Sequence, residues 1–173
     1  MAPPAADRGG LDVALLICSD RAAGGARADE TADRLRPRLA ARGHRLATVR
    51  VVADERAAIE GALRDLASGH PVVLTSGGTG VAPRDVTVEA TRAVIEREVP
   101  GMGEAMRARS LLSTPTALLS RAIAGTRGAA LIVNLPGSPG GAEECLEVVL
   151  PALAHAARLL AGSVADCREE PLR

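Results

Sequence analysis

The chain has 173 residues, with 21 basic and 21 acidic side chains and no formal net charge at pH 7, a balance that argues against electrostatic capture of nucleic acid or of an anionic membrane. It contains no Phe, Tyr or Trp, so bases have no aromatic side chain on which to stack. Its basic residues are all arginines, which excludes a Schiff-base lysine and the lysine of a Walker-type phosphate loop.

Apolar periodicity predicts strands that alternate with helices along most of the chain. Residues 1–10 and 163–173 are rich in Pro, Ala and charge, and we expect a disordered N-terminal tail and a C-terminal tail on either side of one domain, residues 11–162. In chain order the pattern predicts a strand over 12–18, a helix over about 29–42, a strand over 45–52, a helix over 56–67 and a strand over 71–75. A helix over 87–98, a short helix after Pro100-Gly101, a functional loop or irregular segment over 110–121, a strand over 129–135 and a helix over 141–160 follow.

This alternation predicts the fold class and the place of the site. Strands joined through helices indicate a single-domain, three-layer α/β/α sandwich with a mostly parallel central sheet and right-handed crossovers. Such a sheet binds ligands at the carboxyl ends of its strands. Each conspicuous loop of this chain follows a predicted strand: Ser19-Asp20, Asp54, Gly77 to Asp85, and Asn134 to Ser138. We therefore expect these loops to form one site.

The glycine-rich loop is the strongest chemical signal. Ser76-Gly77-Gly78-Thr79-Gly80 follows directly from an apolar strand and leads into a predicted helix. Glycine at such a junction accepts positive φ and lets backbone N–H groups approach an anion. Asp85 places a carboxylate beside that anion site, which makes most sense when a divalent cation lies between the two. The loop therefore indicates phosphate chemistry.

Other glycine motifs do not fit. A Walker loop needs the absent lysine, and a G-x-S-x-G hydrolase elbow is absent. In a dinucleotide fingerprint counted from Gly78 and Gly80 the last glycine position falls on Pro83, and a helix continues where an acidic residue should follow a second strand. A tight turn without ligand explains one or two glycines, but not Gly77, Gly78 and Gly80 together with Asp85.

From Ser76 to Thr91 the chain reads SGGTGVAPRDVTVEAT, which resembles the signature of the MoaB/MogA molybdopterin-binding family, including the G domains of gephyrin and its plant counterpart. The resemblance spans about residues 12–162. It extends to several separate motifs, namely Val99-Pro100-Gly101, Thr116 to Arg121, Asn134 to Pro139, Glu144-Cys145 and Leu150 to Leu153.

The resemblance implies an activity: molybdopterin adenylylation, in which the terminal phosphate of molybdopterin takes AMP from Mg-ATP and pyrophosphate leaves. ATP and molybdopterin are then the substrates and Mg²⁺ the cofactor. The resemblance also implies a homotrimer and handover of the product to a protein that inserts molybdenum.

Two aspartates, Asp54 and Asp85, match the family's functional aspartates. The attacking phosphate oxygen is already deprotonated at neutral pH, and phosphoryl transfer depends mainly on positioning and charge neutralisation. We therefore expect both carboxylates to hold or orient Mg²⁺ rather than to abstract a proton. Glu55 either shares this metal or is an ordinary acidic residue at a helix start. Arg84 and Arg121 either neutralise phosphate or lie exposed on the surface.

The other candidate residues for binding substrate and nucleotide also follow from the resemblance. They are Ser19, Asp20, Ser76, Gly77, Gly78, Thr79, Gly80, Ser120, Asn134, Pro136, Gly137 and Ser138.

One segment departs from the family pattern. Where relatives commonly have D-K-S-G, this chain reads Asp29-Glu30-Thr31-Ala32, so Glu30 replaces a cation. This departure leaves open a non-catalytic molybdopterin-binding or scaffold paralogue, and a purely structural oligomer subunit is a third reading.

The cysteines Cys18, Cys145 and Cys167 are odd in number, far apart and without zinc-ligand spacing. We interpret them as small apolar fillers in a reducing compartment. No stretch reaches the roughly 18 apolar residues of a membrane span. We expect a cytoplasmic protein with neither a membrane nor a nucleic acid as partner.

Overall fold

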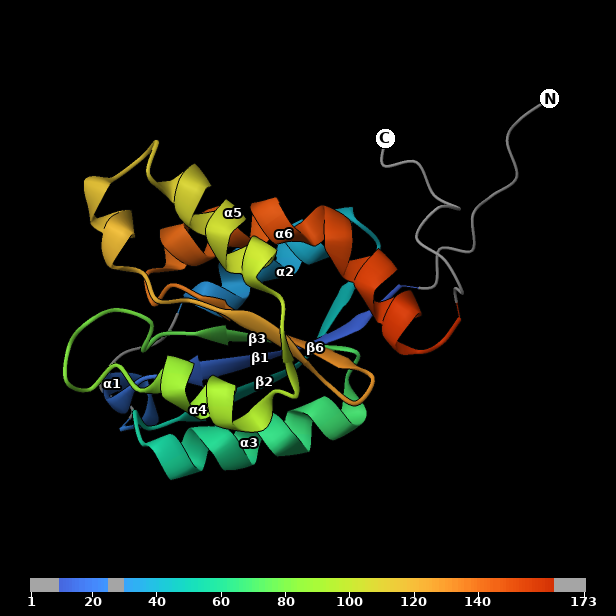
Figure 1. Ribbon diagram of the computed structural model, residues 1–173, viewed down its shortest axis with the longest axis horizontal. Helices are drawn as coiled ribbons and strands as arrows, with labels where there is room; N and C mark the ends of the chain where they lie inside the picture. The colour runs from blue at the N-terminus through green and yellow to red at the C-terminus, as the bar shows by residue number, and fades with distance from the viewer. Residues whose placement is uncertain (1–9, 25–29, 164–173) are drawn as a thin grey trace.

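A six-stranded sheet forms the middle layer of the computed structural model, which describes residues 10–24 and 30–163 (Figure 1). The strand order is β2-β1-β3-β6-β5-β4. The parallel strands are β2 (Arg45–Val52), β1 (Asp12–Cys18), β3 (Val72–Ser76) and β6 (Ala130–Leu135). The two strands at the other edge, β5 (Ala124–Arg127) and β4 (Arg97–Glu98), are antiparallel. The predicted mostly parallel sheet is confirmed.

Helices cover both faces of the sheet (Figure 1). One layer contains α2 (Thr31–Ala41), α5 (Pro100–Ser110) and α6 (Pro139–Leu160), and the other contains α3 (Arg56–Gly69) and α4 (Thr87–Val94). The short α1 (Asp20–Ala23) follows β1, and the 3₁₀ helix η1 (Pro115–Leu119) follows α5. The three-layer α/β/α sandwich is thus as predicted.

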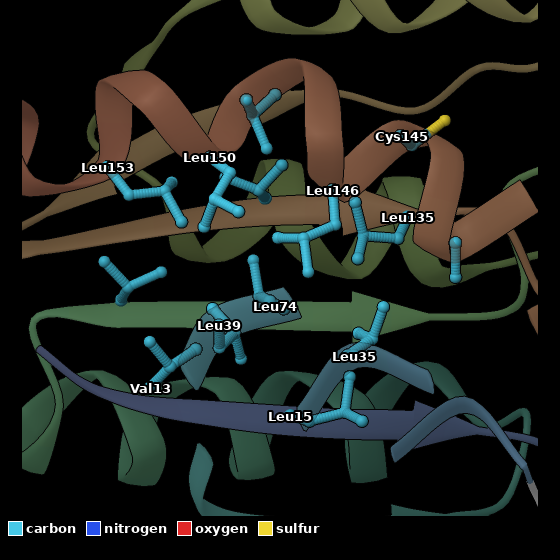
Figure 2. Close-up of a cluster of buried hydrophobic side chains, with 14 of the residues drawn as sticks. Val13, Leu15, Leu35, Leu39, Leu74, Leu135, Cys145, Leu146, Leu150 and Leu153 are labelled. Carbon is cyan, nitrogen blue, oxygen red and sulfur yellow. The ribbon is translucent and has the colours of Figure 1, made fainter. Parts of the chain in front are cut away.

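Strand β1 shows why the apolar runs are uninterrupted. Val13, Leu15 and Ile17 pack in the cluster beneath α2 and α6, whereas the alternate residues Ala14 and Leu16 pack in the cluster beneath α3. Figure 2 shows the first cluster, in which leucines of β1, β3 and α6 meet. Because helices cover both faces of the sheet, the strand cannot alternate apolar and polar residues. Each fully buried Leu side chain stabilises the fold by about 1.5–3 kcal/mol.

The predicted helix over 87–98 is wrong beyond Val94. Ile95 has an extended backbone (φ −70°, ψ 151°), which ends α4. The N–H of Glu96 then donates to the Thr126 carbonyl at 2.7 Å, and the chain enters the sheet as β4. The strand β5 also lay outside the expected elements. Both strands are short, and β4 is exposed, so neither carries the alternation that reveals longer strands.

The predicted tails lie outside the described residues, except for Gly10 at one end and Ser163 at the other. Within the described part of the chain, no helix combines the length and apolar composition needed to cross a membrane.

We predict that the thiol of Cys18 resists alkylation in the folded protein. Cys18 is buried at the end of β1, and burial raises the pKa of its thiol to about 12, with the charge of Asp54 acting in the same direction. Because the thiolate is the reactive form, peptide mapping after iodoacetamide treatment at pH 8 should find Cys18 unmodified in native protein and fully modified in urea. Rapid labelling of native protein would contradict this placement.

Candidate functional site

The loops that follow β1, β3 and β6 touch one another through glycines. A Cβ on Gly77 would lie 2.2 Å from the carbonyl oxygen of Cys18, and a Cβ on Gly137 would lie 3.1 Å from the Cα of Gly77. The hydroxyl of Ser76 donates to the Pro136 carbonyl at 3.0 Å, which joins the second and third loops. At Gly77 only a residue without a side chain permits this approach. The carboxyl ends of the three strands therefore form one surface.

The glycine loop presents backbone N–H groups. Gly77 and Gly78 have φ of +104° and +64°, a left-handed region that favours glycine. The carbonyl of Gly78 accepts from the N–H of Thr87 at 3.1 Å, which fixes the loop to the start of α4. For the N–H groups of Gly78, Thr79 and Gly80, the described residues supply no acceptor. These groups are available to a phosphate.

Asp85 folds back over this loop. Its Oδ2 accepts from the N–H of Ala82 at 2.8 Å, and its own N–H donates to the Ala82 carbonyl at 2.9 Å. A Cβ on Gly80 would lie 2.8 Å from the same Oδ2. The carboxylate is therefore held beside the available N–H groups, at a distance that any larger residue at position 80 would disturb.

Asp20 and Asp54 bind each other's backbone. The N–H of Asp20 donates to Oδ2 of Asp54, and the N–H of Asp54 donates to Oδ1 of Asp20, both at 3.0 Å. Arg84 donates to Oδ2 of Asp20 from Nε at 3.1 Å and from Nη2 at 2.5 Å. The Asp54 N–H and the Arg84 guanidinium hold the pKa of Asp20 below its usual range. These hydrogen bonds connect Asp54, in the loop after β2, through Asp20 to Arg84, which directly precedes Asp85.

The donor set fits Mg²⁺ held together with a substrate. The described residues contain no group of three or more His, Cys, Asp or Glu side chains that could form a complete metal site. Mg²⁺ is usually held by one or two carboxylates together with substrate phosphates and waters. Oδ1 of Asp54 and Oδ1 of Asp85 accept no hydrogen bond from the described residues. Asp54 and Asp85 could therefore each give Mg²⁺ one oxygen without breaking a protein contact.

Asn134 does not face the site, contrary to its predicted role in ligand binding. Its side chain is fully buried, and Nδ2 donates to the hydroxyls of Thr75 at 3.0 Å and Thr91 at 2.8 Å. Its Oδ1 accepts from the N–H of Ile123 at 3.4 Å. The next residue, Leu135, points to the opposite face of the sheet, toward α6. Asn134 therefore fastens α4 to the sheet.

Two other predicted binding residues are occupied by local contacts. The hydroxyl of Ser19 caps α1 by accepting from the N–H of Ala22 at 3.2 Å, so the loop expected at Ser19-Asp20 is the start of a short helix. The hydroxyl of Ser138 caps α6 by accepting from the N–H of Gly141 at 3.2 Å. Each serine orients a helix N-terminus, and the N-terminus of the long α6 favours negative charge.

A cavity of about 240 Å³ adjoins the glycine loop. Its wall includes Thr79, Gly80, Ser120, Pro136 and Ser138 from the predicted site. The remaining polar lining consists of Arg107, Ser110, Thr114, Thr116 and Glu144. Thr116 and Glu144 lie in motifs that carry the family resemblance, and Ser110 and Thr114 lie in the segment 110–121 expected to be functional or irregular, whereas no local pattern marks Arg107.

The cavity wall carries both charge signs, each held in place. Arg107 donates from Nη1 to the Ala122 carbonyl at 2.8 Å. Glu144 accepts from the hydroxyls of Ser113 at 2.7 Å and Ser110 at 3.2 Å. An ordered cation and an ordered carboxylate suit a heterocycle with donor and acceptor edges.

The fold and this site define an α/β protein whose glycine loop offers backbone N–H groups to an anion at the carboxyl edge of a parallel sheet. Residues 14–155 match the family described as "Probable molybdopterin binding domain", and the chain belongs to that family. The resemblance seen in the sequence motifs is confirmed.

Named relatives and solved structures agree with this assignment. The chain is 46% identical over 147 residues to the molybdopterin adenylyltransferase of Escherichia coli K12, covering 80% of this chain and 73% of the relative. It is 45% identical over 125 residues to that of Helicobacter pylori J99, covering 71% of each. The structure matches the molybdopterin biosynthesis enzyme MoaB of Thermus thermophilus with a TM-score of 0.82 and 46% identity, over 94% of this chain and 99% of the other.

Proposed function

We propose that this chain is a molybdopterin adenylyltransferase of molybdenum cofactor biosynthesis. The main support is that the available N–H groups of Gly78 to Gly80 lie beside the carboxylate of Asp85. The chain is also 44–46% identical to relatives with that name. A phosphate cradle beside a carboxylate suits transfer between two phosphates better than simple ligand storage.

In the proposed reaction, an oxygen of the molybdopterin phosphate attacks the α-phosphorus of ATP. A new P–O–P bond forms, and the bond from the α-phosphorus to pyrophosphate breaks. The N–H groups of the glycine loop bind phosphate oxygens and orient them. Asp54 and Asp85 would hold Mg²⁺, which when bound neutralises phosphate charge. The capped N-terminus of α6 at Ser138 adds a positive dipole end.

We infer that the cavity beside the loop takes the pterin of the substrate. Arg107 and Glu144 give it one fixed donor and one fixed acceptor, which match the mixed edge of a pterin. The adjoining glycine loop then receives the phosphate of the same molecule.

We predict pyrophosphate release and an AMP adduct when the purified chain is mixed with molybdopterin and Mg-ATP. Binding of Mg-ATP at 100 times its Kd should stabilise the fold by about 2.7 kcal/mol, which a thermal-shift assay can follow with and without Mg²⁺. Tight molybdopterin binding with no Mg-ATP shift and no pyrophosphate would favour a scaffold paralogue. Binding of neither ligand would favour a structural subunit.

The remaining parts of the proposal are a homotrimer, a cytoplasmic location and handover of the product to a molybdenum-insertion protein. Leu112, Leu118 and Leu119 are 78%, 71% and 53% exposed and supply apolar surface for a partner. Use of ATP and the free thiols of Cys18 and Cys145 suit a reducing cytoplasm. Sedimentation velocity tests the trimer.

A further inference from the structure

One arginine holds both ends of the exposed part of the phosphate loop. Arg121 lies between η1 and β5, and its Nε donates to the Gly80 carbonyl at 2.6 Å while its Nη2 donates to the Asp85 carbonyl at 2.7 Å. Its backbone N–H also donates to the Thr79 carbonyl at 2.9 Å. Residues 81–84 are exposed between these two anchored carbonyls. Arg121 therefore sets the span that the loop must cover.

Glu89 on α4 orients the guanidinium. Its Oε1 accepts from Nη1 of Arg121, and its Oε2 accepts from Nη2 at 3.4 Å. The hydrogen bond from Arg121 lowers the pKa of Glu89. The side chains are 35% and 41% exposed, and a pair this exposed is worth only about 0–1 kcal/mol of stability. The pair therefore contributes more to geometry than to the free energy of unfolding.

These contacts leave Arg121 little capacity for a ligand. A guanidinium has five N–H donors in a rigid fork, and four hydrogen bonds already go to Gly80, Asp85 and Glu89. A phosphate gripped in bidentate fashion would have to displace the carbonyls that shape the loop. The contacts thus argue against direct neutralisation of phosphate, one of the two roles that the sequence left open to Arg121.

We propose that Arg121 and Glu89 are a positioning pair for the phosphate loop, which keeps the loop N–H groups and Asp85 aligned without touching substrate. This inference rests on the proposed adenylyltransferase function. Lysine at position 121 keeps the charge but cannot reach two carbonyls and a carboxylate together. A misplacement of about 1 Å at a reacting centre can cost about 10²-fold in rate.

The kinetic test compares Glu89→Gln, Arg121→Lys and the double variant. We expect each single variant to lower kcat by about 10–100-fold, with little change in the KM for molybdopterin. The double variant should be no slower than Arg121→Lys, because both substitutions break the same unit. Glu60→Gln and Arg64→Lys, which alter an ion pair within α3 that, among the described residues, makes no hydrogen bond to the loop, are the matched controls and should behave as wild type.

A direct phosphate contact predicts a different pattern. Glu89→Gln would then release positive charge toward the bound phosphates, so the KM for molybdopterin or for ATP would fall or stay unchanged and kcat would be kept. That result, or full additivity in the double variant, would overturn the positioning role.

Hydrogen exchange tests the pair without any activity. The N–H groups of Ala82 and Asp85 are hydrogen bonded within the loop, and we expect their exchange to accelerate at least about tenfold in both single variants as loop opening becomes easier. Unchanged exchange in folded protein would overturn the proposal. If Arg121→Lys does not fold, folded Glu89→Gln decides alone. If wild-type protein shows no adenylylation, the proposed function fails, while the exchange data still report on the pair.

Discussion

Replacing Asp85 by asparagine is expected to lower kcat for adenylylation by about 10²–10³-fold, the range seen when one electrostatic element of an active site is removed. Asparagine keeps an oxygen that can accept from the Ala82 N–H, so the hydrogen bond that folds this side chain over the loop survives. What is lost is the negative charge and with it a ligand for Mg²⁺. Pyrophosphate release at saturating Mg-ATP measures the effect.

The same substitution separates metal binding from loop shape. In Asp85→Asn the Mg²⁺-dependent part of ATP affinity, measured by calorimetry, should shrink while the melting temperature stays within a few degrees of wild type. Asp65→Asn is the matched control, because Asp65 forms an exposed ion pair with Arg50. Full activity of Asp85→Asn would contradict the role assigned to this carboxylate.

The strands of the sheet interior were predictable because burial on both faces produces a continuous apolar run in the local sequence. In β1 every residue after the first is buried and apolar, so an apolar run alone reveals the strand. β4 gives no such signal, since both of its residues are exposed and its register depends on β5. A two-residue edge strand exists only because its partner lies alongside, and a local pattern cannot show that partner.

For the site, the position of the loops was predictable, but the contacts of their side chains were not. Loops after parallel strands must meet at one edge, so the segments at Gly77 and Pro136 could be brought together from sequence alone. The hydrogen-bond partners could not. Asn134 was predicted to bind the ligand because it lies in a family motif. Its hydrogen-bond partners are Thr75 on a neighbouring strand and Thr91 on a helix that is far away in the sequence. Which face a polar residue takes depends on such partners.

Replacing Gly78 by alanine is expected to destabilise the protein by about 2–4 kcal/mol, from a left-handed backbone on a residue with a Cβ and from overpacking. Gly78 has φ +64°, and a Cβ there would lie 2.2 Å from Oγ1 and 3.3 Å from the backbone N of Thr87. The side chain of Thr87 can rotate, but its backbone is the first residue of α4 and cannot yield without moving the helix. Urea denaturation measures the loss.

Gly61→Ala is the matched control, because it adds the same methyl group where nothing lies within 4 Å, inside α3. Alanine favours a helix interior over glycine by about 0.5–1 kcal/mol, so this variant should gain stability while Gly78→Ala loses it. Opposite signs of the change in the free energy of unfolding would show that position 78 requires glycine because of its left-handed backbone and its close contact with α4. Equal signs would mean that the loop relaxes easily, and a loop that relaxes so easily could not hold its N–H groups ready for phosphate.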